Sequence, residues 1–369
     1  MMDRRKTGRE RGGKVMEKLK KLCNHILIDG LSGMALGLFA TLIVGTIIQQ
    51  IGTLVGGRAG DTLFLFGKLA AALTGAGIGV GTACKFKASP LVVLSAATAG
   101  MAGAFASGIL AGSVLSDGAV VLSGPGEPLG AFIAALTGIE LGRLVSGRTK
   151  IDILVTPLTV IVSGSIAGLI FGPPISSLMT ALGGLINWGT VQQPFLMGIV
   201  VSVLMGMILT LPISSAALGV ILNLSGLAAG AATVGCCCNM VGFAVASFRE
   251  NRLGGLLAQG VGTSMLQVPN IVRKPLIWLP AIISSAVLGP VGTMLLHMEN
   301  NATGSGMGTS GLVGQIMTWQ VMAPVDGPAL TLVKILLIQV ILPAAVTLAV
   351  SEFMRKKGWI QYGDMKLDL

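Results

Sequence analysis

The sequence predicts an all-α integral membrane protein with about ten transmembrane helices and two re-entrant hairpins. Apolar residues make up 53% of the 369 residues, only 11% are charged, and the mean hydropathy is +0.84. A soluble domain carries about 25% charged residues, so this chain has too little charge for an ordinary wetted surface. The 54 glycines favour helices that pack closely in lipid. Together these numbers exclude a soluble enzyme, a disordered chain and a secreted disulfide scaffold.

Ten apolar stretches are candidates for helices that cross the hydrocarbon core, which takes about 20 residues. The shortest of them, 174–190, has an alternative placement flat at the membrane interface. The stretches are about 31–55, 62–83, 90–112, 128–147, 151–172, 174–190, 193–213, 217–247, 276–298 and 329–352.

Two further apolar segments, about 254–271 and 305–327, are interrupted by glycine and proline. Irregular backbone is tolerated at membrane depth only where protein or a water-filled cavity satisfies its polar groups. We therefore expect both segments to form re-entrant hairpins.

Positive charge predicts the orientation, because cytoplasmic loops carry an excess of Lys and Arg. With ten spans, the basic loops fall on the same side as both termini, and Arg58 is a minor exception. We expect a multi-pass protein of the cell membrane with a basic cytoplasmic segment at 1–24, one transmembrane domain at 25–352 and a cytoplasmic tail at 353–369. The basic ends fit membrane lipid, and no nucleic-acid partner is expected.

Residues suited to catalysis or metal binding are scarce. The consecutive Cys236, Cys237 and Cys238 point in different directions on a helix, unlike the spaced pairs of zinc sites. His25 and His297 are the only histidines, and no G-x-x-x-x-G-K-[ST] loop is present. We expect no catalytic residue, no metal and no cofactor in this chain.

Polar groups inside a bilayer are costly, which makes them candidates for function. Glu140 lies inside the fourth span, three residues before Arg143, so it either lines a solute path or forms a local ion pair. Glu127 lies in GPGEP, where glycine and proline exclude a regular helix and favour a loop or a cavity wall.

The broken segments carry many hydrogen-bonding side chains, which predicts that they face a polar cavity. The aromatic ring of Trp319, beside amides and a carboxylate, suits a sugar-binding surface or, equally, an interfacial anchor. The first segment offers Gln259, Thr263, Ser264, Gln267 and Asn270, and the second offers Ser310, Gln315, Thr318, Trp319, Gln320 and Asp326.

Several motifs resemble enzyme IIC, the membrane component of bacterial sugar phosphotransferase systems, and its fructose-type branch in particular. They are TKIDILVTPLTVIVSGSIAGLIFGPPISSLMTALGGLINWG (149–189) and MILTLPISSAALGV (207–220), which takes the place of that branch's Gly-Pro-Asn break. Residues 25–352 are still more similar to a smaller group of stand-alone IIC-like proteins described as regulators of toxin genes. The stretches that carry this likeness are GPGEPLGAFIAALTGIELGRLVSGRTKIDILVTPL and TSMLQVPNIVRKPLIWLP.

The resemblance implies a IIC fold, a homodimer, and movement of a carbohydrate by an elevator-like displacement of one subdomain. In that family a partner IIB domain phosphorylates the sugar during uptake. The fructose branch has a carboxylate in its first hairpin, whereas LLAQGVGTSMLQVPN (256–270) contains no acidic residue. The chain also lacks a IIB-like cysteine loop and a IIA-like histidine site, so any phosphoryl donor must be a separate IIA or IIB protein.

The sequence thus predicts a transporter of a polar organic solute, a sugar or sugar derivative, with an elevator-type mechanism. The alternatives are a membrane-embedded sensor without net transport, and a IIC permease component that works with separate IIA and IIB proteins. As an enzyme the chain is at most that component. The expected binding residues are Glu127, Glu140, Gln259, Thr263, Ser264, Gln267, Asn270, Gln315, Trp319 and Asp326.

Overall fold

The computed structural model describes residues 24–116, 118–122 and 124–367, and this part of the chain is almost entirely helical. Within it, six helices are long and apolar enough to cross a membrane. A seventh span is counted if α4 and α5, bent by 54°, form one. With the shorter apolar helices α6 and α10, these helices cover all ten predicted stretches, because α9 covers two. The prediction of an all-α membrane protein is confirmed.

The first half of the chain forms one set of helices, with a short β-hairpin as its only strands among the described residues. A continuous helix from His25 to Val55 contains two π-helical turns, His25–Gly30 and Phe39–Ile43, and opens the set. The elements are α2 (Leu31–Leu38), α3 (Val44–Val55), α4 (Gly57–Ala72), α5 (Thr74–Lys85), α6 (Pro90–Ala104), α7 (Ala106–Leu110), β1 (Leu115–Ser116), β2 (Ala119–Val120), α8 (Pro128–Val145) and α9 (Asp152–Thr190).

The second half is built around α12 and includes both predicted hairpins. Its elements are α10 (Pro194–Thr210), α11 (Ser215–Ile221), α12 (Gly226–Ala246), α13 (Phe248–Leu257), η3 (Ala258–Gly262), η4 (Ser264–Gln267), α14 (Val268–Arg273), η5 (Pro275–Trp278), α15 (Leu279–Pro290), η6 (Val291–Leu295), α16 (Ala302–Ser305), η7 (Ser310–Leu312), α17 (Val313–Asp326), α18 (Pro328–Ile335), η8 (Leu336–Ile341) and α19 (Leu342–Lys356).

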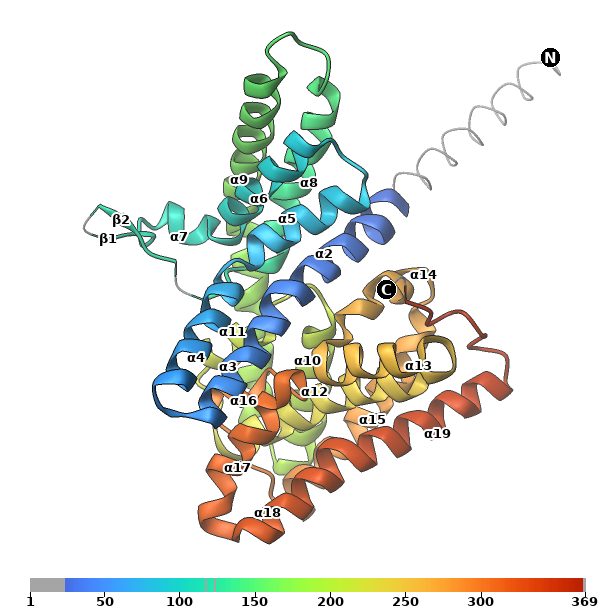
Figure 1. Ribbon diagram of the computed structural model, residues 1–369. Helices are drawn as coiled ribbons and strands as arrows, with labels where there is room; N and C mark the ends of the chain where they lie inside the picture. Colours follow the sequence, from blue (N-terminus) through green and yellow to red (C-terminus); the bar gives the residue numbers. More distant parts are fainter. Residues whose placement is uncertain (1–23, 117, 123, 368–369) are drawn as a thin grey trace, which may run out of the picture.

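Glycines set the distance between helices in the first half. The helices α2 and α5 run side by side (Figure 1) and face each other through two Gly-x-x-x-Gly pairs. A Cβ atom added to Gly33 would collide with the backbone at Gly81, and one added to Gly37 would collide with the backbone at Gly77. Only residues without a side chain allow this approach, which gives the helices extensive van der Waals contact in lipid.

The long helix α9 joins the two halves. The sequence predicts two segments here, 151–172 and 174–190, but the structure has one helix of 39 residues that contains Pro157, Pro173 and Pro174. Its first part packs on α6, α7 and α8, since Gly168 contacts Gly103. Its last part packs on α10 and the end of α11.

The helix α12 is the centre of the second half (Figure 1), and almost all of its residues are buried. It packs against α10, α15 and α19. The predicted stretch 217–247 is therefore not one helix, because it breaks at 222–225 into α11 and α12. The first hairpin (248–273) follows the C-terminal end of α12. The second hairpin (300–326) starts beside its N-terminal end, where Asn300 pairs with Gly226.

The glycine contact between α2 and α5 yields a stability prediction. Gly37→Ala should lower the free energy of unfolding by about 1–3 kcal/mol, because its Cβ has no room against Gly77. Thermal unfolding of the detergent-purified protein measures the change. Gly184→Ala is the matched control, since a Cβ on Gly184 of α9 meets nothing within 4 Å. Equal melting temperatures for the two variants would contradict the proposed packing.

Candidate functional site

A cavity of about 40 Å³ lies where the two hairpins meet the break between α10 and α11. Polar side chains enter its wall from three separate segments. The lining residues are Leu38, Leu42 and Ile43 of the first long helix, Pro128 of α8, Leu209, Ile213, Ser214, Ser215 and Ala216 at the break, Thr263 and Met265 of the first hairpin, and Met307 and Ser310 of the second. We call this space the central cavity.

The hairpin tips reach the central cavity because both lie along α12. Gly260 of the first hairpin contacts Ala244, and Gly308 of the second packs directly on Cys236. Gly308 has a φ of +53°, so it combines a left-handed backbone with a contact that leaves no room for a side chain. The hairpins therefore approach from opposite ends of α12 and meet at its middle, as predicted for re-entrant segments.

The tip of the first hairpin is fixed by its own hydroxyl groups. The Thr263 hydroxyl accepts a hydrogen bond from the Met265 N–H at 3.2 Å, and Ser264 pairs with Thr210 of α10 at 2.8 Å. Thr210 also donates to Asn239 of α12 at 3.2 Å. Thr263 therefore faces the cavity, while Ser264 ties the tip to the helices behind it.

Glu127 lies at the edge of the cavity, in the loop that precedes α8. Its backbone N–H donates to the Ala104 carbonyl at 2.8 Å, and its carboxylate faces the backbone N–H groups of Leu129 and Ser214. Burial raises the pKa of Glu127 from the ordinary 4.5 to about 7, a shift that these two N–H groups partly oppose. Near neutral pH the carboxyl group can therefore both donate and accept hydrogen bonds.

Two polar atoms at this site are buried without a protein partner. They are Oε1 of Glu127 and the hydroxyl oxygen of Ser310, whose side chain is only 1% exposed. A buried polar atom without a hydrogen bond costs about 1–3 kcal/mol, so such atoms point to water or a polar ligand. Ser310 lines the central cavity, and Glu127 lies next to it, beside the lining residues Pro128 and Ser214.

The three amides of the first hairpin are held elsewhere. Gln259, Gln267 and Asn270 are buried and bond to one another and to the backbone of residues 365 and 366. Among the described residues they do not line the central cavity. The predicted binding set is therefore divided, with Glu127, Thr263 and Ser264 near the cavity and these amides behind the hairpin.

The three residues of the second hairpin that were expected to bind solute, Gln315, Trp319 and Asp326, are not among the residues that line the cavity. Gln315 donates to Gln339 of the helix that leads into α19 at 3.0 Å, and Trp319 is 38% exposed on the outer side of α17. Asp326 forms an ion pair with Lys334 at 2.7 Å across the α17–α18 turn. These contacts hold the hairpin and its neighbours together.

Glu140 lies at the far end of α8 from Glu127. Its carboxylate is 2.9 Å from His25 Nε2 and 3.2 Å from Arg143, and its side chain is 43% exposed. The His25 ring stacks on Phe86 with ring centroids 3.9 Å apart. This geometry matches the ion pair that the sequence offered as one of two readings, and it ties the first helix to α8.

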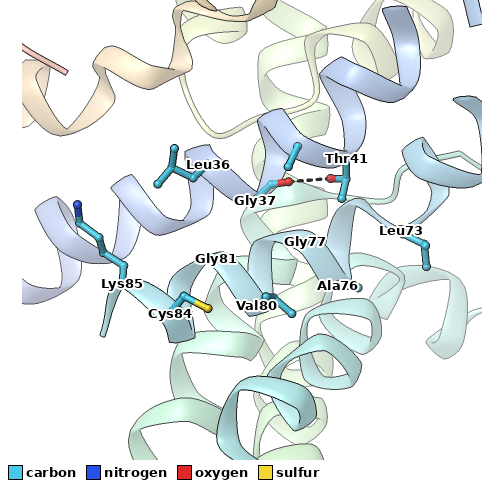
Figure 2. Close-up of a pocket in the computed structure, with 11 residues that line it drawn as sticks. Leu36, Gly37, Thr41, Leu73, Ala76, Gly77, Val80, Gly81, Cys84 and Lys85 are labelled. Carbon is cyan, nitrogen blue, oxygen red and sulfur yellow. Dashed lines mark hydrogen bonds between the residues drawn. The ribbon is translucent and has the colours of Figure 1, made fainter. Parts of the chain in front are cut away.

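A second, wider hollow of about 680 Å³ runs between α2 and α5 (Figure 2). Its walls are apolar except for Thr41 and Lys85, and the Thr41 hydroxyl already donates to the Gly37 carbonyl at 2.8 Å. A groove with so few free polar groups suits hydrocarbon better than a hydroxyl-rich solute. We therefore place the candidate site in the central cavity.

Sequence reasoning missed Ser214 and gave Ser310 no special weight. Both lie where helices break, Ser214 after Pro212 in LPISSAA and Ser310 after the Gly308 turn. A serine that follows a helix break inside an apolar stretch is the signal that identifies them.

The sequence matches the family model of the phosphotransferase system EIIC over residues 28–367. A search of the curated proteins gave no significant match. The family match confirms the resemblance to enzyme IIC and supports a membrane-embedded permease component of sugar transport, without specific support for the fructose-type branch.

The raised pKa of Glu127 yields a pH-dependence prediction. A carboxyl group with a pKa near 7 when folded and near 4.5 when unfolded stabilises the fold most below pH 4.5, and this contribution is lost as the pH rises to about 7. Glu127→Gln stays neutral and lacks this loss. The melting temperature of the variant relative to the original protein should therefore rise between about pH 5 and pH 8. A constant difference across that range would show that Glu127 does not titrate as described.

Proposed function

We propose that this chain, which belongs to the phosphotransferase system EIIC family, transports a polar organic solute, a sugar or sugar derivative, that binds in the central cavity. One observation carries the proposal. Both hairpin tips, the α10–α11 break and the start of α8 converge on one space, where Ser310 has a hydroxyl without a partner and Glu127 lies next to the lining residue Pro128.

The chemistry of the cavity suits a hydroxyl-rich ligand. A sugar hydroxyl that leaves water needs a donor and an acceptor in its place. Ser310 and Thr263 supply hydroxyl groups from the two hairpins, and Glu127 supplies a carboxyl group beside Ser214. The apolar wall formed by Leu38, Leu42 and Ile43 suits the C–H faces of a sugar ring.

The central cavity is too small for a sugar, so binding requires a conformational change. Its 40 Å³ holds a few water molecules, whereas small-molecule pockets measure about 300–1,000 Å³. The hairpins must separate from the break and from the first long helix before a solute fits. We propose that they do so in an elevator-type displacement of one set of helices relative to the other, in a homodimer with both termini in the cytoplasm.

A phosphoryl donor enters this proposal only as a separate protein. The described thiols of α12, Cys236, Cys237 and Cys238, are buried within the helix packing and offer no accessible nucleophile. If the solute is phosphorylated, detached IIA and IIB proteins must supply the phosphoryl group. One observation favours the alternative of a sensor without net transport. The amides of Gln267 and Asn270 bind the backbone of residues 365 and 366, so they are not free to bind a solute.

A ligand screen tests the site. Sugars, sugar acids and polyols are added to the detergent-purified protein, and a ligand that binds only the folded state raises its melting temperature. Glu127→Gln and Ser310→Ala should each weaken binding about tenfold, since a hydrogen bond to a buried polar group contributes about 1.5 kcal/mol. Ser177→Ala, on an exposed face of α9, should bind normally. Unchanged affinity in both cavity variants would remove the central cavity from the proposal.

Reconstituted vesicles separate transport from sensing. A ligand found in the screen should exchange across the vesicle membrane with the original protein and much more slowly with Glu127→Gln. Binding without any flux would favour the sensor, and flux that requires added IIA and IIB proteins would favour the phosphorylating permease.

A further inference from the structure

The segment after α19 folds back onto the first hairpin. Helix α19 ends at Lys356, and residues 358–367 then run to α13 and α14, where the chain end is seen in Figure 1. Ile360 is 2% exposed and Met365 is 0% exposed, so the segment is packed into the protein. We call residues 358–367 the return segment.

Side-chain amides of the hairpin bind the main chain of the return segment. Asn251 of α13 donates to the Met365 carbonyl and accepts from the Leu367 N–H, both at 2.8 Å. Gln267 donates to the same Met365 carbonyl at 2.9 Å, and Asn270 donates to the Lys366 carbonyl at 2.8 Å. Two successive peptide groups, 365–366 and 366–367, are thus recognised by both donors and acceptors, just after a turn at 362–365.

The hairpin also supplies a pocket for one side chain. Met365 is enclosed by apolar residues of α12, α14, η5 and α19, including Phe243, Ile271, Ile277 and Met354. Ile360 belongs to the same cluster. Only Ile271 of this cluster belongs to the hairpin, so the hairpin and its neighbouring helices together hold the two side chains.

One ion pair and one charge-assisted hydrogen bond hold the turn of the return segment. Lys274, just after α14, lies 2.6 Å from Asp364 of the return segment. Glu250 of α13, whose side chain is 1% exposed, lies 3.2 Å from Arg355 and accepts the Gly363 N–H at 3.0 Å. The Glu250–Arg355 pair, with side chains 1% and 9% exposed, joins α13 to α19 and is costly to break, because either partner would be left unpaired.

A chain of amides connects the return segment to both arms of the hairpin. Gln267, after the tip, donates to Gln259, before the tip, at 2.8 Å. Gln259 in turn donates to the Ser247 hydroxyl at the end of α12 at 2.9 Å. The Met365 carbonyl is thus linked through two side chains to the base of the hairpin, whose tip residue Thr263 lines the central cavity.

We propose that the outer face of the first hairpin is a peptide-binding site and that its ligand is the return segment of this chain. Occupancy of the site holds the two arms of the hairpin together and so fixes the tip against the central cavity. The link to solute binding rests on the proposed function, whereas the peptide site itself does not.

Hydrogen exchange on a shortened protein tests the site. In a variant that lacks residues 358–369, backbone amides of 255–270 should exchange about tenfold faster or more, because the arms lose their common partner. Amides of 90–104 in α6, which packs on α5, α8 and α9, should be unchanged. Equal exchange in the first hairpin with and without the segment would overturn the proposal.

A synthetic peptide provides the converse measurement. Addition of a peptide of residues 358–367 to the shortened protein should restore slow exchange in 255–270. The same peptide with Asp364→Ala and Met365→Ala should not, because it lacks the ion pair and the side chain that fills the pocket. If neither peptide binds to a properly folded shortened protein, the site is not a peptide-binding site.

Point variants of the full chain separate loss of the contact from a folding defect in the shortened protein. Asn251→Ala should accelerate exchange in 255–270, because it removes two bonds to the return segment. Arg249→Ala on the same helix loses only a partly exposed pair with Glu352 and should leave exchange unchanged. Equal exchange in the two variants would count against the proposal. All these measurements are made without solute, so they stand even if no sugar binds.

Discussion

The irregular backbone of the two hairpins is the constraint on which the rest of the structure depends. Inside a membrane, each N–H or C=O group without a partner costs several kcal/mol, so a broken helix must be enclosed by protein. The helix α12 meets this need by lying between the hairpins, with almost all of its surface buried. Side-chain amides complete the pairing, as where Asn300 donates to Thr233, Thr318 and the Gly314 carbonyl at the base of the second hairpin.

This enclosure also explains why the central cavity is small and why few of its polar atoms lack a hydrogen-bond partner. The hydrogen bonds that stabilise the hairpins use most of their polar atoms, and among the described lining residues Ser310 keeps a buried hydroxyl without a partner. A rigid scaffold with few free polar groups is how a binding site combines affinity with selectivity. In the first hairpin, the tip residue Thr263 lines the central cavity, whereas Gln259, Gln267 and Asn270 lie further from the tip and hold the hairpin together.

Composition was sufficient to predict the all-α membrane class, and glycine and proline interruptions predicted the two hairpins, because lipid restricts the possible backbone structures. Glu127 was identified because a carboxyl group in an apolar, proline-rich segment needs a reason to be there. The roles of Gln259, Gln267 and Asn270 were not predictable, since an amide pairs equally well with a sugar hydroxyl and with a peptide group. The peptide groups that Gln267 and Asn270 bind lie about 100 residues further along the chain. The continuity of α9 was missed because Pro173 and Pro174 normally end a helix, whereas here the helix runs through both.

The length of α9 has a consequence for the surrounding lipid. Its 39 residues span about 58 Å, nearly twice the roughly 30 Å of a hydrocarbon core. Transmembrane helices tilt by at most about 40°, which is not enough to absorb the difference. Yet apolar side chains are exposed along the whole rod, from Ile153 to Trp188. A single crossing therefore cannot place the whole apolar length of α9 in hydrocarbon, so part of its exposed surface must lie along the membrane interface or against a second protein surface.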